Sequence, residues 1–78
     1  MILAVMPAFN EEHTISDIIK RTEKYVDEVV VIDDCSSDRT SEVAKKAGAT
    51  VIKHKENRGL GGALRTGFDY ALKRRADI

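Results

Sequence analysis

The residues with the clearest chemical potential are two adjacent aspartates, Asp33 and Asp34, which follow the apolar run Val29–Ile32. A carboxylate can accept the ring N–H of uracil or the N1–H and N2–H of guanine, and a neighbouring carboxylate can accept ribose hydroxyls. A hydrogen bond to a charged group is worth about 1.5–3 kcal/mol, so this pair could hold a nucleoside. The alternative is that an aspartate here, either one of this pair or the nearby Asp38, only caps the following helix. We favour that alternative for Asp38 and favour binding for Asp34.

A second polar group, Pro7-Ala8-Phe9-Asn10-Glu11, follows the first apolar run of the chain, Ile2–Met6. Glu11, Asp33 and Asp34 could also converge as oxygen ligands of a divalent metal. Because the chain offers no further acid at the end of an apolar run, the sequence favours nucleotide binding over a metal site here.

The third chemical feature is the glycine-rich stretch Gly59-Leu60-Gly61-Gly62. It is not a dinucleotide-binding G-x-G-x-x-G motif, because Leu64 occupies the third glycine position. It is not a Walker A loop either, because Phe68-Asp69 follows Gly67 where Lys-Ser/Thr is required. A glycine-rich helix start with free N–H groups, followed by Arg65, could instead meet phosphate. The alternative, that the glycines only allow close packing of a helix on a sheet, stays open.

The remaining reactive side chains receive structural or surface assignments. Cys35 is expected to be a small residue in a tight turn, because no histidine adjoins it in the sequence to activate a thiol. His13 and His54 have polar neighbours, so both are expected at the solvated surface. The run Lys73-Arg74-Arg75 suits an exposed helix end and is weak evidence for nucleic-acid binding.

These residues must be positioned by alternating strands and helices. Short apolar runs of the kind found in strands buried on both faces predict strands at residues 2–6, 29–32 and 50–52. Helical spacing predicts helices after each strand, the second ending at Gly48. The third helix is expected to turn one apolar face to the sheet, made of Leu60, Ala63, Leu64, Gly67, Phe68, Ala71 and Leu72.

The resulting order, β-α-β-α-β-α, predicts an α/β class with three layers and an open parallel sheet. Ligands of such sheets bind beyond the carboxyl ends of the strands, where the polar groups described above lie. Ala76-Asp77-Ile78 resembles the opening of a fourth strand. We therefore expect residues 1–78 to be a single, incomplete nucleotide-sugar-binding domain.

Composition excludes several classes of protein. With 42% hydrophobic and 33% charged residues, the chain is typical of a globular segment, and its one cysteine permits no internal disulfide. The apolar start, Met1–Phe9, is too short for a membrane span and lacks the basic leader of a signal peptide. The net charge of zero hides a first half that is acidic and a second half that is basic. The halves could neutralise each other, or carboxylates could face phosphate-binding cations across a site.

Three blocks of the sequence together resemble family 2 inverting glycosyltransferases. These blocks are Val5–Glu11, Val31–Thr40 and Asn57–Gly67, and they occur in the family's order and at its spacing. The resemblance implies a GT-A fold, which is a Rossmann-like fold, a cytoplasmic active site and a UDP- or GDP-sugar donor. The form Asn57-Arg58-Gly59-Leu60-Gly61 is most similar to the branch that transfers sugars to dolichyl and other polyprenyl phosphates.

The same resemblance assigns site residues. It implies that Pro7, Phe9 and Glu11 line the base and ribose pocket, and that Asp34 holds the base with Asp33 beside it. The full set of expected nucleotide-sugar-binding residues is Pro7, Ala8, Phe9, Asn10, Glu11, Asp33, Asp34, Gly61 and Arg65, the last two towards the diphosphate.

The resemblance also implies parts of the site that these 78 residues do not include. The family's D-x-D motif, which binds Mg²⁺ or Mn²⁺, and the general base that activates the acceptor are both expected beyond residue 78. No catalytic residue and no metal ligand are therefore expected within the chain, which should be inactive by itself. Any association with a membrane surface is expected through other parts of the protein.

Two other functions compete with this interpretation. A non-catalytic nucleotide-binding or interaction module could complete the open sheet by forming a homo-oligomer, because an open sheet exposes apolar surface and an unpaired edge. A nucleotidyltransferase would require a glycine-rich, basic loop after the first strand, and Pro7-Ala8-Phe9-Asn10 is neither.

Overall fold

The computed structural model describes residues 1–75 of the chain. Its elements are β1 (Leu3–Ala8), α1 (Ile15–Thr22), β2 (Glu28–Asp33), α2 (Thr40–Lys46), β3 (Thr50–Lys53) and α3 (Gly59–Arg74). This order confirms the predicted β-α-β-α-β-α arrangement. The fourth strand expected to open at Ala76–Ile78 lies outside the described residues.

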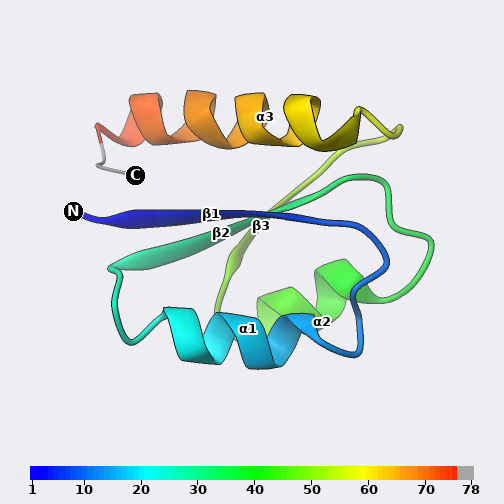
Figure 1. Ribbon diagram of the computed structural model, residues 1–78, viewed down its shortest axis with the longest axis horizontal. Coiled ribbons are helices and arrows are strands. Elements are labelled where there is room, and N and C mark those ends of the chain that lie inside the picture. The colour runs from blue at the N-terminus through cyan, green and yellow to red at the C-terminus, as the bar shows by residue number, and fades with distance from the viewer. Residues whose placement is uncertain (76–78) are drawn as a thin grey trace.

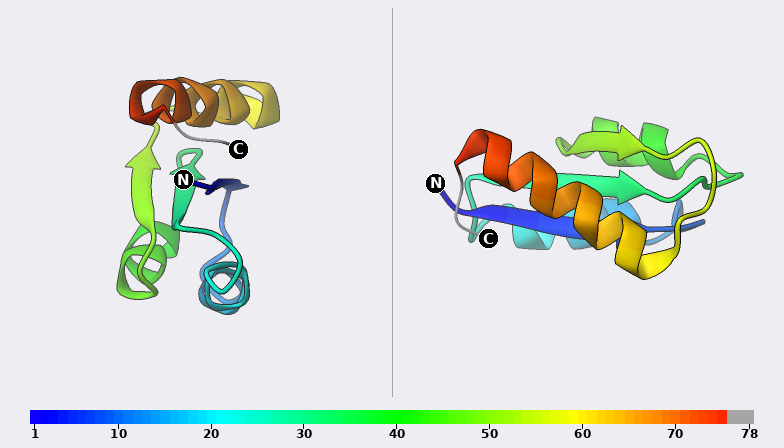
Figure 2. Two further views of the ribbon diagram at one scale, coloured as in Figure 1. Left: turned by 90° about the vertical axis from the view of Figure 1, so that its left-hand side faces the viewer. Right: turned by 90° about the horizontal axis from the view of Figure 1, so that it is seen from above.

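The strands form one parallel sheet in the order β1-β2-β3, with Met6 paired with Val31 and Val31 paired with Val51. Helices α1 and α2 cover one face of this sheet and α3 covers the other, so the molecule has three layers (Figures 1 and 2). The α/β class predicted from the sequence is confirmed. Because all three strands run in the same direction, their carboxyl ends meet at one edge of the sheet.

The two faces of β2 bury alternate residues in separate cores. Val29 and Val31 pack in the core under α1 and α2, and Val30 and Ile32 pack in the core under α3. Burying one such aliphatic side chain contributes roughly 1.5–3 kcal/mol. An uninterrupted apolar run is therefore the pattern that a central parallel strand requires.

The prediction for the buried face of α3 was wrong in part. Its small residues Ala63, Gly67 and Ala71 face the sheet, whereas a stripe of large residues stays substantially exposed: Leu60, Leu64, Phe68 and Leu72. The reason is the close approach of α3 to β1. A Cβ atom at Gly67 would lie 2.2 Å from Cγ1 of Val5, so only small residues fit against the sheet.

Candidate functional site

A pocket of about 230 Å³ lies at the carboxyl ends of β1 and β2, beside the start of α3. It is lined by Pro7, Ala8, Phe9, Glu11, Asp34, Gly59, Leu60 and Ala63. Three segments that are far apart in the sequence therefore meet in one place. This is the edge of a parallel sheet at which ligands of α/β proteins bind.

The turn after β1 is fixed by the turn after β2. Asn10 adopts a left-handed backbone conformation, its N–H donates to Ser36 Oγ at 2.8 Å, and its Oδ1 accepts the N–H of Ser37 at 2.9 Å. The N–H of Glu11 donates to Thr40 Oγ1 at 2.8 Å. Asn10 is thus part of the scaffold and does not line the pocket.

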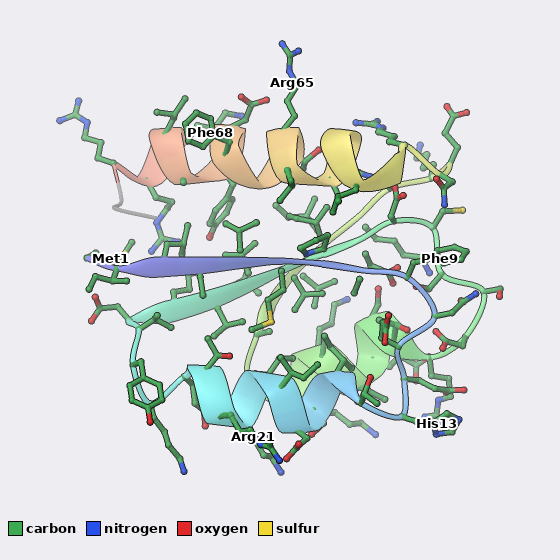
Figure 3. The ribbon with its side chains drawn as sticks, in the orientation of Figure 1. Met1, Phe9, His13, Arg21, Arg65 and Phe68 are labelled. Atoms are coloured by element: carbon green, nitrogen blue, oxygen red, sulfur yellow. The ribbon has the colours of Figure 1, made fainter. Side chains whose placement is uncertain are left out.

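Two side chains that follow β1 remain available to a ligand. Phe9 is 49% exposed and lies beyond the end of the sheet (Figure 3). Glu11 is also exposed, and its Oε2 accepts the hydroxyl of Thr14 at 3.1 Å. An aromatic face and a carboxylate therefore border the pocket on the β1 side.

Asp33 has a different environment from its neighbour. Its carboxylate is fully buried, where it accepts the N–H of Ser36 at 3.0 Å and the hydroxyl of Ser41. It does not line the pocket. The structure therefore places Asp33 at the end of β2, where its carboxylate holds the turn that connects β2 to α2.

Asp34 lines the pocket and also holds the start of α3. Its carboxylate accepts the N–H groups of Arg58 and Gly59, both at 2.8 Å, and lies 2.9 Å from Nδ1 of His54. The Arg58 N–H, the His54 ring and the Gly59 N–H hold the pKa of Asp34 below its usual value, although burial opposes them. No local sequence signal predicts these bonds, because the partners are 20 to 25 residues away.

The prediction for His54 was wrong, whereas that for His13 is confirmed. His54 is only 4% exposed, and its Nε2 lies 2.7 Å from the hydroxyl of Thr66 in α3. Polar neighbours in the sequence suggested a surface position. However, the ring points under α3, which covers this face of the sheet. His13 is exposed in the turn before α1 (Figure 3).

The two residues expected near a diphosphate lie outside the lining of the pocket. Gly61 is exposed in the first turn of α3, and no atom lies within 4 Å of the Cβ it lacks. Arg65 points away from the sheet (Figure 3) and lines a second hollow of about 430 Å³ with Val5, Leu64 and Phe68.

Two residues near the turn after β2 have the structural positions expected of them. Asp38 accepts the N–H of Thr40 at the start of α2 at 2.9 Å, which confirms its capping function. Cys35 lies in the turn with a left-handed backbone, and its thiol donates to the carbonyl of Lys55 at 3.4 Å.

The described residues do not provide a metal centre. No group of three or more histidine, cysteine, aspartate or glutamate side chains within residues 1–75 could hold an ion. The carboxylates of Asp33 and Asp34 instead accept protein hydrogen bonds. No helix in this part of the chain is long and apolar enough to cross a membrane.

Comparison with known proteins decides the family. The family model described as Glycosyl transferase family 2 matches residues 3–74, which include all three segments that meet at the pocket. The chain belongs to glycosyl transferase family 2. Its resemblance to that family, inferred from the three blocks, is thereby confirmed.

Two relatives show how much of a longer protein the chain matches. An uncharacterized protein of Methanocaldococcus jannaschii is 53% identical over 72 residues, which are 91% of this chain and 30% of the relative. Human dolichyl-phosphate beta-glucosyltransferase is 37% identical over 82 residues, with 82% of this chain and 25% of the relative covered. The chain thus spans about a third or less of the length of these relatives.

A solved structure confirms the GT-A fold of this family 2 chain. Glucosyl-3-phosphoglycerate synthase of Mycobacterium tuberculosis, in complex with Mn²⁺, UDP-glucose and phosphoglyceric acid, superimposes with a TM-score of 0.79 at 32% identity. The match covers 90% of this chain and 29% of that chain. The described residues form part of a GT-A domain.

Proposed function

We propose that residues 1–75 form the nucleotide-binding part of the donor site of a glycosyltransferase that uses a UDP- or GDP-sugar. The observation that carries the proposal is the pocket in which the end of β1, Asp34 and the first turn of α3 meet. Membership of family 2 and the UDP-glucose complex of the structural relative support it.

The lining of the pocket suits a nucleoside. Pro7, Phe9 and Leu60 offer apolar surface to a base and a ribose, and an aromatic ring can stack on the base. Glu11 and Asp34 offer carboxylate oxygens to base N–H groups or ribose hydroxyls. Asp33 would act through the turn that it holds, as a positioning residue.

The start of α3 suits the diphosphate that follows the nucleoside. The N–H of Gly59 is bonded to side-chain oxygens of Asp34 and Asn57. Within residues 1–75 no side chain accepts the N–H groups of Leu60 and Gly61 in the same first turn of this 16-residue helix, so these two groups can donate to an anion. The helix dipole adds a partial positive charge at the same place. Arg65 could contribute only from the outer face of α3, so its contact with the diphosphate remains part of the proposal.

Transfer with inversion places the acceptor oxygen on the anomeric carbon as the nucleoside diphosphate leaves. The described residues would hold the leaving nucleotide. The acceptor is proposed to be a polyprenyl phosphate, because the human relative is a dolichyl-phosphate glucosyltransferase. Mg²⁺ or Mn²⁺ remains a proposal for a D-x-D motif beyond residue 78, as does a cytoplasmic active site.

Calorimetric titration of UDP and GDP into matched variants tests the nucleotide site. We expect Phe9→Ala and Asp34→Ala each to weaken binding about tenfold or more, because each removes one stacking surface or one charged hydrogen bond. Phe68→Ala is the matched control for Phe9→Ala, since Phe68 is also an exposed phenylalanine (55%) but lies on the outer side of α3. Equal affinities for all four proteins would contradict the proposal.

A further inference from the structure

The one buried histidine among residues 1–75 connects two elements of the site. His54 directly follows β3, and its N–H donates to the carbonyl of Asp33 at 2.8 Å, which places the side chain beside the end of β2. Its ring then bridges Asp34 on one side and Thr66 of α3 on the other. Neither the family match nor the names of the relatives assign a function to this residue.

The two ring nitrogens have distinct tasks. Because an ionised carboxylate can only accept hydrogen bonds, Nδ1 must carry the proton that Asp34 Oδ1 receives at 2.9 Å. Nε2 lies 2.7 Å from the hydroxyl oxygen of Thr66, whose single proton can be donated either to Nε2 or to the carbonyl of Gly62, 3.1 Å away. The hydrogen bond at Nδ1 therefore connects His54 to Asp34, which lines the pocket, and the hydrogen bond at Nε2 connects His54 to α3.

The geometry points to His54 as a positioning residue of the nucleotide site. We infer that its Nδ1–H fixes the rotation of the Asp34 carboxylate, so that Oδ1 and Oδ2 receive the N–H groups of Arg58 and Gly59 and hold the first turn of α3 against the pocket. His54 does not line the pocket and would not contact the ligand.

The inference explains why a polar residue is buried at this position. A buried group without hydrogen bonds costs roughly 1–3 kcal/mol, and both nitrogens of His54 are satisfied. With three donors on one carboxylate, Asp34 has little freedom to rotate. The pocket wall that Asp34 and Gly59 form is thus set before a nucleotide arrives, which lowers the cost of binding.

Two amide substitutions separate the tasks of the ring nitrogens. His54→Asn keeps a donor near the position of Nδ1 and loses the bond to Thr66. His54→Gln keeps a partner for Thr66 and loses the bond to Asp34. Thr66→Val removes the partner of Nε2 and leaves the Asp34 bond intact. All three proteins are compared with the unaltered protein by calorimetry with UDP and GDP, and by the amide NMR signals of Arg58 and Gly59.

The expected result is a difference between the two amides. His54→Gln should weaken nucleotide binding about tenfold and shift the Arg58 and Gly59 signals, which report the bonds to Asp34. His54→Asn and Thr66→Val should stay within about threefold of the unaltered affinity and keep those signals, because both retain a donor to Asp34. A purely structural function of His54 would make the Asn and Gln variants equally poor.

Two results would overturn the inference. One is equal loss in His54→Asn and His54→Gln, which would assign the effect to the volume of the ring. The other is unaltered amide signals and affinity in His54→Gln. The inference rests on the proposed nucleotide site. The two readouts distinguish failure of the inference from failure of the proposed function. If the unaltered protein binds neither UDP nor GDP, the proposed function fails, while the amide signals still decide whether His54 orients Asp34.

Discussion

At the scale of single residues, Asp34 links the proposed chemistry to the fold. The same carboxylate lines the pocket and accepts three hydrogen bonds from the segment between His54 and Gly59. A substitution at Asp34 would therefore alter both ligand binding and the start of α3. The effect on the fold can be measured separately, as the pH dependence of stability without a ligand.

The pH dependence of stability follows from the lowered pKa of Asp34. The folded protein ionises this carboxyl more readily than the unfolded chain, in which its pKa is about 3.9. Its contribution to the free energy of unfolding is therefore complete above that pH and is lost as the pH falls through the folded pKa.

Urea unfolding at several pH values tests this expectation. We expect the difference in unfolding free energy between the unaltered protein and Asp34→Asn to shrink as the pH falls from about 5 towards 2. Asp38 and Glu28, whose pKa values are also lowered, titrate in both proteins and so cancel. A difference that is independent of pH would contradict the assigned hydrogen bonds.

Residue by residue, the sequence predicted the site better on the β1 side than around α3. Pro7, Phe9 and Glu11 follow the first strand directly, so their place at its carboxyl end follows from the apolar run before them. The position of His54 could not be predicted in this way. Its burial depends on α3, which covers this face of the sheet and contacts the His54 ring through Thr66.

At the scale of elements, the packing of α3 decides how the site is built. The helix begins with Gly59, in a left-handed conformation, and descends onto β1 and β2 through its small residues. The sequence pattern predicted the helix. It could not show that Gly67 rather than Phe68 meets the sheet, because that choice depends on the distance between α3 and Val5.

A pair of glycine substitutions tests this packing. Gly67→Ala should lower the free energy of unfolding by about 1–3 kcal/mol, because the new methyl group would overlap Val5. Gly61→Ala meets no atom and should instead be neutral or raise it, by at most about 1 kcal/mol, through helix propensity. Denaturant titration measures both. Adding Val5→Ala should restore part of the stability lost in Gly67→Ala. Similar changes in unfolding free energy for Gly67→Ala and Gly61→Ala would contradict the close packing of α3 on β1.

At the scale of the whole molecule, one side of the sheet is open within residues 1–75. β1 pairs only with β2, and the exposed stripe of Leu60, Leu64, Phe68 and Leu72 runs along the neighbouring helix. Because α3 lies on the face opposite α1 and α2 (Figure 2), a parallel strand that followed it by a right-handed crossover would pair with the free edge of β1. That order would place the pocket at the point where strand order reverses.

The open side also predicts the behaviour of residues 1–78 as an isolated chain. Exposed apolar surface and an unpaired edge favour self-association. Light scattering should therefore show dimers or larger species, and Leu64→Lys combined with Phe68→Glu should shift them towards monomers. A monomeric unaltered chain at high concentration would contradict this expectation.

The central claim is that the ends of β1 and β2 and the start of α3 together bind a nucleotide. Amide NMR signals followed during titration with UDP and GDP test it most directly, since they locate the ligand without any substitution. We expect saturable shifts at Phe9, Glu11, Asp34 and Gly59–Ala63, and none at Leu3 or Arg74 at the opposite end of the sheet. Shifts confined to that opposite end, or none with either nucleotide, would contradict the claim.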